Sequence, residues 1–280
     1  MVKLSKGVMM NNKYLRYILG FLMLALILFA FLTSQFILFV VSIFFIIIAT
    51  MEYRKMFKGK NIYVHKFLPE LIGIMLAFVF SFSTDISSHH LVTPILLFGI
   101  IFSYIITVLR NKKPYMLSSM ATIGAILFTF CGLYIIKLTY FYEHISAFYL
   151  ITVYFIIVLI GDWSALLAGK LLKNTKPLAV EISPDKTIAG AVANLIFSCL
   201  TSLLLMIFLE FNVYQCLGFG IVTSIFAQFG DLTISSIKRD LGLKHSGTLF
   251  FEYGGILDRM DSFLFSAPAV YYYLFLPTMF

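Results

Sequence analysis

Charged residues are scarce in this 280-residue sequence, where Asp, Glu, Lys and Arg together make up 12%, about half their share in a soluble domain. Apolar residues reach 61%, and Phe alone contributes 31 residues. A chain this poor in charge and this rich in apolar side chains is not a soluble enzyme, a disordered chain or a nucleic-acid-binding module. The composition predicts an all-α, polytopic membrane protein, a bundle of transmembrane helices.

Cysteine and tryptophan are also rare, with three Cys residues and one Trp. Cys131, Cys199 and Cys216 stand alone in or beside apolar stretches, with no Cys-x-x-Cys pair and no neighbouring His cluster. This spacing excludes a disulfide-stapled secreted domain and offers no zinc site. We expect the three cysteines to be packing residues.

Long apolar runs occur nine times along the chain, each bounded by charged or turn residues. The first run follows three lysines, as a signal peptide would, but it is too long for one and no small-x-small cleavage site follows it. We therefore expect about nine membrane spans. They are residues 14–33, 35–51, 68–83, 91–109, 115–136, 147–161, 188–209, 213–230 and 256–279.

The cations indicate the orientation of these spans. If the N-terminus is cytoplasmic and the chain alternates sides, 20 of the 21 Lys and Arg residues fall in cytoplasmic segments, and only Lys137 falls outside. The positive-inside rule therefore predicts a cytoplasmic N-terminus and an odd number of spans. It also accounts for the formal net charge of +8 without a nucleic-acid partner.

Polar chemistry is concentrated in the second part of the chain. We predict an N-terminal transmembrane region, residues 1–160, and a catalytic transmembrane region, residues 161–280, with its active site at the cytoplasmic face. Nine of the 13 acidic residues lie in the second region, and eight of them, all but Glu210, lie on the face predicted to be cytoplasmic. Carboxylates and cations gathered at one membrane face favour chemistry on phosphates over a plain channel or scaffold.

The strongest motif runs over residues 230–240. If it is helical, Asp231, Ser235 and Lys238 share one face, and Arg239 lies beside it. An aspartate near the bilayer is costly and is expected to have a cation or a metal as its partner. The alternative is an ordinary helix end with snorkelling Lys and Arg side chains.

A second motif, Gly254-Gly255-Ile256-Leu257-Asp258-Arg259-Met260-Asp261-Ser262, follows it. Asp258 and Asp261 are three residues apart, so a helix would place them on one face. Magnesium suits such a pair, because it takes one or two carboxylates plus phosphate oxygens. The alternative is that the glycines only aid packing and that Arg259 neutralises the aspartates.

Two weaker motifs precede these. Ser183-Pro184 is typical of a helix start, where free N–H groups attract phosphate, and Lys186 adds a positive charge. The alternative is a plain capped helix start. Asp162 lies at the predicted end of the sixth span, which alone carries little weight.

Together these residues resemble the phosphatidate cytidylyltransferase (CDP-diacylglycerol synthase) family. The resemblance covers the last 120 residues and has three blocks: Asp162 with Ala165 and Gly169; Ser183-Pro184-x-Lys186-Thr187-x-x-Gly190; and the ordered series from Gly230-Asp231 to Asp261-Ser262. The chain departs from the family pattern at four residues, Ala189, His245, Glu252 and Tyr253.

The resemblance implies an enzyme that makes CDP-diacylglycerol and pyrophosphate from CTP and phosphatidate, with Mg²⁺. It implies that the metal is held by Asp231 and Asp258, with Asp261 close by. Catalysis would rest on Asp231, Asp258, Lys238 and Arg239. Substrate phosphates would be neutralised or positioned by Ser183, Lys186, Thr187, Ser235, Lys238, Arg239, Lys244 and Arg259. It further implies a multi-pass protein of a bacterial-type inner (plasma) membrane, and a homodimer by analogy alone.

Three other functions compete with this one. The four departures allow a diverged member that acts on another lipid phosphate or is inactive. A secondary transporter would need ionisable residues inside several spans, and the first region has almost none. A CDP-alcohol phosphotransferase would carry an Asp-x-x-Asp-Gly motif, which the sequence lacks.

Overall fold

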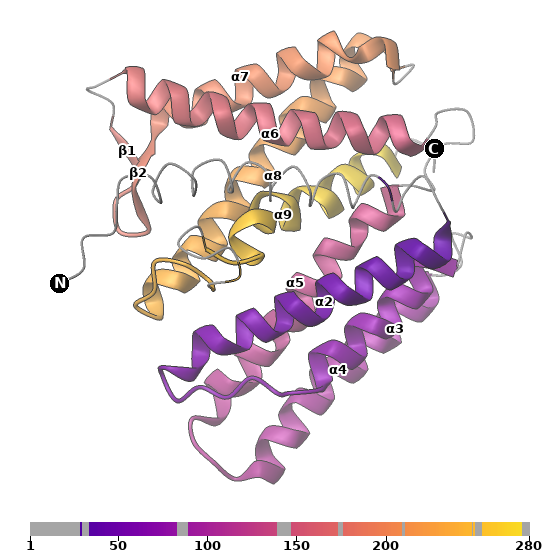
Figure 1. Ribbon diagram of the computed structural model, residues 1–280, viewed down its shortest axis with the longest axis vertical. Helices are drawn as coiled ribbons and strands as arrows, with labels where there is room; N and C mark the ends of the chain where they lie inside the picture. Colours follow the sequence, from indigo (N-terminus) through magenta and orange to yellow (C-terminus); the bar gives the residue numbers. More distant parts are fainter. Residues whose placement is uncertain are drawn as a thin grey trace, which may run out of the picture.

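The computed structural model describes residues 34–82, 89–138, 147–172, 176–208, 211–247 and 254–275, together with Phe29 and Leu249. These residues form long α-helices, one 3₁₀ turn and a single short hairpin (Figure 1). The helices are α2 (Gln35–Lys58), α3 (Leu68–Phe82), α4 (His89–Arg110), α5 (Tyr115–Lys137), α6 (Ala147–Leu171), α7 (Ile188–Leu204), α8 (Val213–Asp240) and α9 (Leu257–Phe275). The remaining elements are β1 (Pro177–Ala179), β2 (Ser183–Thr187) and the turn η3 (Met206–Phe208).

Five of these helices, α2, α4, α5, α6 and α8, are long and apolar enough to cross a membrane, and α3 and α7 are shorter apolar helices. The protein is therefore a helical membrane protein, as the composition predicts. The predicted span over residues 14–33 lies outside the described residues, and α9 is not among the five. The total of nine spans and the cytoplasmic N-terminus stay predictions.

Successive helices alternate in direction, so the described connections 59–67, 111–114, 176–187 and 241–247 gather at one end of the bundle (Figure 1). Long-range hydrogen bonds join these connections to nearby helices. Tyr63 N–H donates to Ser118 Oγ of α5 at 3.1 Å, and Arg239 Nε of α8 donates to the Ile182 carbonyl at 3.0 Å. This polar end carries the motifs that the sequence singles out.

Helix α9 packs against α8 and also against α5, and so connects the later helices of the bundle with an earlier one. The Tyr134 hydroxyl on α5 lies 2.8 Å from the Tyr272 hydroxyl on α9, and the Tyr154 hydroxyl on α6 lies 2.7 Å from Ser266 Oγ. Buried tyrosines place their hydroxyl groups against such partners because an unpaired one is costly. The helix that bears Asp258 and Asp261 is thereby fixed from both sides.

The predicted helix start at Ser183-Pro184 is wrong. Residues Ser183–Thr187 form β2, which pairs antiparallel with β1 in the register Pro177↔Thr187 and Ala179↔Ser183. Proline disfavours helical backbone in the residue before it, so Ser183 is extended. Helix α7 begins after Thr187, whose hydroxyl accepts the Gly190 N–H at 3.0 Å, as N-cap threonines do. The all-α prediction is confirmed, because this short hairpin is a small exception among the long helices of the described residues.

Two other expectations can be compared with the helices. The three cysteines are free, and Cys216 is buried, in agreement with a packing role. Helix α6 runs without a break across the predicted boundary at residues 160 and 161, and the division into two regions stays a prediction.

A small polar cluster stabilises the connection between α2 and α3. The His65 ring is buried, and its Nε2 lies 3.1 Å from the Ser103 carbonyl and 3.0 Å from Thr107 Oγ1. The His65 backbone N–H donates to Thr122 Oγ1 at 3.2 Å. The His65 side chain therefore joins the α2–α3 connection to α4, and the His65 backbone joins the same connection to α5.

Candidate active site at the polar end of the bundle

Three carboxylates from three helices converge at the polar end. Asp162 comes from α6, Asp231 from α8 and Asp261 from α9, and each lies within electrostatic range of the other two. Like charges so placed repel one another unless cations compensate them. The site therefore favours a cationic partner, whether protein side chain or metal.

Asp162 is held by side chains that the sequence motifs did not single out as site residues. Asn194 Nδ2 donates to its Oδ1 at 3.4 Å, and Ser262 Oγ donates to its Oδ2 at 3.0 Å. The Asn194 amide oxygen in turn accepts the Ser224 hydroxyl at 2.7 Å. Polar residues of α7 and α9 thus orient the Asp162 carboxylate, and Ser224 of α8 in turn holds Asn194.

Asp231 pairs with a lysine of the hairpin. Lys186 Nζ in β2 lies 2.6 Å from Asp231 Oδ2, and Ser235 Oγ donates to Oδ1 at 3.4 Å. The expected helical face of Asp231, Ser235 and Lys238 is confirmed in its geometry, because all three lie on α8. The hairpin, although unpredicted, carries Lys186 to this face.

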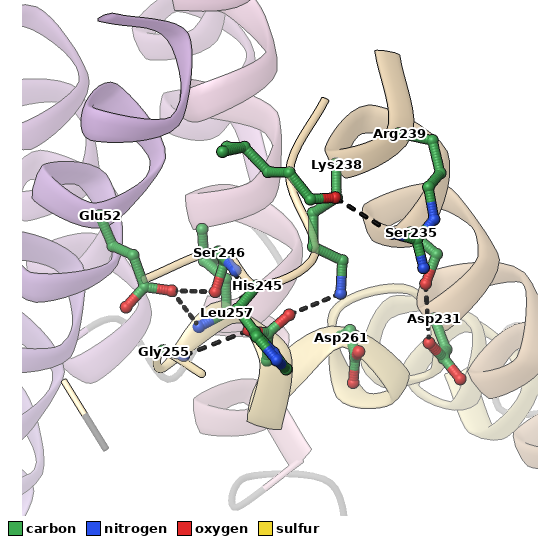
Figure 2. A network of polar contacts seen from close by, with 12 residues as sticks. Glu52, Asp231, Ser235, Lys238, Arg239, His245, Ser246, Gly255, Leu257 and Asp261 are labelled. Atoms are coloured by element: carbon green, nitrogen blue, oxygen red, sulfur yellow. Dashed lines mark hydrogen bonds and ion pairs between the residues drawn. The ribbon is translucent and has the colours of Figure 1, made fainter. Parts of the chain in front are cut away.

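Asp258 lies in a network with Lys238, Ser246 and Gly255, three residues that Figure 2 labels. Lys238 Nζ lies 2.5 Å from its Oδ1, while Oδ2 accepts the backbone N–H groups of Ser246 at 2.8 Å and Gly255 at 3.2 Å. Both side chains of the ion pair are about nine-tenths buried. His245 Nδ1 lies 3.8 Å from Oδ2. Each oxygen of Asp258 therefore already has a donor.

Asp261 lies within electrostatic range of Asp231 and Asp162, and also of Lys238. Its Oδ1 accepts the N–H of Ser262 at 2.9 Å, and its backbone carbonyl lies against Gly230 of α8, where a Cβ would come within 2.3 Å. Gly230 therefore permits the close contact of α8 with α9 that brings Asp231 and Asp261 together.

The other predicted site residues are dispersed around this centre. Arg239 is exposed and donates to the carbonyls of Ile182 and Leu243, at 3.0 and 3.2 Å, so it joins the hairpin to the end of α8. Thr187 caps α7, while Lys244 is exposed. Ser183 starts β2 and is half-buried, as is Arg259 on α9. Glu252 and Tyr253 lie outside the described residues.

Sequence reasoning did not find Glu52 of α2. Its buried carboxylate accepts the hydroxyl of Ser246 and the backbone N–H groups of Ile256 and Leu257, the latter two at 2.8 and 3.0 Å (Figure 2). A signal exists in the sequence, because Glu52 is the one acidic residue in the 24 residues of α2. A lone acid at the end of an apolar span is expected to have a partner.

Within the described residues, no three His, Cys, Asp or Glu side chains form a ready-made metal cage. Magnesium does not require one, because it keeps several waters and binds one or two carboxylates together with substrate phosphates. The repelling carboxylate oxygens of Asp162, Asp231 and Asp261 are of the donor type that this ion prefers. The residues present therefore fit magnesium that arrives with a nucleotide.

Comparison with known proteins agrees with the resemblance. Proteins named phosphatidate cytidylyltransferase from Staphylococcus saprophyticus and Staphylococcus aureus are 43% identical over 116 residues and 42% identical over 132 residues. These segments cover 41% and 46% of this chain. The chain spans about half the length of these relatives, 44% and 50%. The sequence model of the cytidylyltransferase family matches residues 14–276, nearly the whole chain, and the protein therefore belongs to the cytidylyltransferase family.

Proposed function

We propose that the protein is a membrane nucleotidyltransferase that makes CDP-diacylglycerol and pyrophosphate from CTP and phosphatidate. The observation that carries this proposal is the convergence of Asp162, Asp231 and Asp261 beside two lysines, Lys186 and Lys238, at one end of a membrane bundle. Family membership supports the nucleotide, and the names of the relatives support the lipid.

In this reaction an oxygen of the lipid phosphate attacks the α-phosphorus of CTP. A new phosphorus–oxygen bond forms there, the bond to the oxygen that bridges to the β-phosphorus breaks, and pyrophosphate leaves with the electron pair. The lipid phosphate is already ionised near neutral pH, so no general base is needed. The task of the protein is to position two anions and to compensate their charge.

Lysines are suited to that task because they already balance the aspartates when substrate is absent. Lys186 pairs with Asp231, and Lys238 pairs with Asp258. Incoming phosphate oxygens compete for these ammonium groups, which frees carboxylate oxygens at the same moment. Ser183, Thr187, Ser235, Arg239, Lys244 and Arg259 are proposed as further phosphate-positioning groups.

Magnesium is proposed as the cofactor, held by Asp231 and Asp261, with Asp162 beside them. When bound, it withdraws charge from the phosphate oxygens and from the leaving group. Asp258 stays a proposed ligand, and it would have to loosen its contact with Lys238 to act as one.

An apolar cavity supports a lipid substrate. It lies between α2, α5 and α9, and its lining includes Ile256, Leu257 and Met260, which flank Asp258 in sequence. An acyl chain in this cavity would leave its phosphate at the polar end. The multi-pass fold agrees with an integral membrane protein, and an inner (plasma) membrane and a homodimer remain proposals.

The proposal is tested by mass-spectrometric detection of the liponucleotide made by the full chain from CTP and phosphatidate. We expect Asp231→Asn and Asp258→Asn each to reduce product formation by at least about 100-fold, and Asp231→Asn to do so without changing expression or membrane insertion. Asp240→Asn is the matched control, because Asp240 is exposed at the end of the same helix as Asp231.

Chelation provides a second arm. Excess chelator should abolish turnover, and added magnesium should restore it. Near-normal turnover in both variants would defeat the metal assignment, and full activity in chelator would contradict the mechanism. Incubating the protein with labelled CTP and each of several lipid phosphates in turn shows whether phosphatidate or another lipid phosphate is the acceptor.

A further inference from the structure

A carboxylate from the first part of the chain reaches into the polar end. Glu52 lies near the end of α2, and its side chain is buried, with 6% exposure. The residues that it contacts come about 200 positions later in the sequence. Figure 2 shows Glu52 extending from α2 toward Ser246 and Leu257.

Glu52 caps the N-terminus of α9. Its Oε2 accepts the Ile256 N–H at 2.8 Å, and its Oε1 accepts the Leu257 N–H at 3.0 Å. The first N–H groups of a helix have no partner within the helix, and a negative charge there is favourable. In α9 this partner is supplied by another helix, so α2 fixes where α9 begins.

The surrounding chain is shaped to admit this carboxylate. A Cβ on Gly255 would lie 2.0 Å from Glu52 Cδ, and one on Gly247 would lie 2.8 Å from it. Gly254 has a φ of +92°, which side-chain-bearing residues rarely adopt. The glycine pair therefore permits a close approach to α2, a neighbouring helix.

The groups that bind Glu52 also bind Asp258. Ser246 donates its hydroxyl to Glu52 and its backbone N–H to Asp258 Oδ2. Gly255 lies against the Glu52 carboxylate and donates its own N–H to the same Asp258 oxygen. Asp258 is the second residue of the helix whose start Glu52 caps.

We propose that Glu52 is a positioning residue for nucleotidyl transfer: it fixes the Ser246 loop and the start of α9, and thereby the geometry of Asp258 and its partner Lys238. The inference rests on the proposed function, and it adds a residue of the first region to the site. It also means that the N-terminus of α9 is not a phosphate site, because a protein carboxylate already occupies it.

The test compares Glu52→Gln with wild type in the full chain reconstituted with phosphatidate. The amide keeps the size of the side chain but offers one acceptor oxygen in place of two. That one oxygen cannot serve all three donors, the Ser246 hydroxyl and the N–H groups of Ile256 and Leu257. We expect kcat to fall about 100-fold, as a misplaced catalytic group would cause, with the KM for CTP little changed. Hydrogen exchange of residues 254–260 should become faster.

Glu70→Gln is the matched control. Glu70 is another largely buried carboxylate of the first region, and it pairs with Arg54 on α2 rather than with α9. It should leave kcat and the exchange of residues 254–260 unchanged. If Glu52→Gln does not fold, Glu52→Asp replaces it, because it keeps the charge but retracts the carboxylate by one methylene.

The outcomes are distinguishable. A wild-type chain that makes no liponucleotide defeats the proposed function, while the exchange comparison still tests the cap. An active wild type with a Glu52 variant whose kcat equals that of the Glu70→Gln control overturns the positioning role. Unchanged exchange at residues 254–260 overturns the cap itself.

Discussion

At the scale of single residues, the site is an arrangement of aspartates balanced by lysines. The Lys238–Asp258 pair is about nine-tenths buried. Removing one member of such a pair is more harmful than replacing both, because it leaves an uncompensated charge. Under the proposed function, variants of Lys238 are therefore expected to combine a catalytic and a structural effect. Variants of the partly exposed Lys186–Asp231 pair are expected to report more directly on substrate binding.

His65 should make stability depend on pH. Burial lowers the pKa of its imidazole, the Ser103 carbonyl opposes that shift, and the charge of Arg110 adds to it. Because the unfolded chain then takes up the proton first, acid favours unfolding. We expect the melting temperature to fall as pH drops below about 6.5, as thermal unfolding in detergent would show.

His65→Gln cannot titrate and should flatten that fall. His90→Gln, which alters an exposed histidine of α4, is the control and should keep the wild-type slope. Equal slopes in wild type and His65→Gln would contradict the assignment.

At the scale of elements, three helices and one hairpin build the site. Helices α6 and α8 bring one carboxylate each, α9 brings Asp258 and Asp261, and the hairpin brings Lys186. Arg239 anchors this hairpin through two directed N–H groups to the carbonyls of Ile182 and Leu243. A guanidinium can hold two carbonyls in this way, and an ammonium group cannot reproduce the same fork.

Arg239→Lys should therefore loosen the hairpin while preserving its charge. We expect faster hydrogen exchange in residues 176–187 and a higher KM for CTP, because Lys186 is carried by the same hairpin. Residues of α3 serve as the internal reference. Unchanged exchange over the hairpin would show that Arg239 does not anchor it.

The sequence predicts some of these elements and not others, for physical reasons. The face of α8 follows from helical periodicity, which is local, so the placement of Asp231, Ser235 and Lys238 on one helix is predicted correctly. The hairpin depends on pairing between two short segments, and Ser183-Pro184 fits a helix start equally well. The contacts of Glu52 with Ser246 and Leu257 depend on packing across some 200 residues, which no local pattern encodes.

At the scale of the whole molecule, alternating helices bring residues 59–67, 111–114, 176–187 and 241–247 to one end (Figure 1). The cations that the sequence assigns to the cytoplasm lie at this end wherever the structure describes them. The helical membrane fold is confirmed by the apolar helices, and family membership by the matching sequence model. The side of the membrane on which this end lies follows only from the positive-inside rule.

Cysteine labelling tests that orientation. In a chain with Cys131, Cys199 and Cys216 replaced, Lys60→Cys and Lys244→Cys should react with an impermeant thiol reagent only after cells are permeabilised. Asp85→Cys, between α3 and α4, should react in intact cells. Labelling of Lys60→Cys in intact cells would reverse the predicted topology.

The cap on α9 constrains how this protein can be divided or recombined. A fragment starting at residue 161 would contain every motif shared with the family, yet the first amides of its last helix would face no acceptor from α2. A chimera that takes its front half from a relative inherits the same defect unless that half supplies an acid at the equivalent point. Under the proposed positioning role, the first region is more than a scaffold, and we expect exchange between family members to succeed only when the combined halves keep an acid that reaches the start of α9.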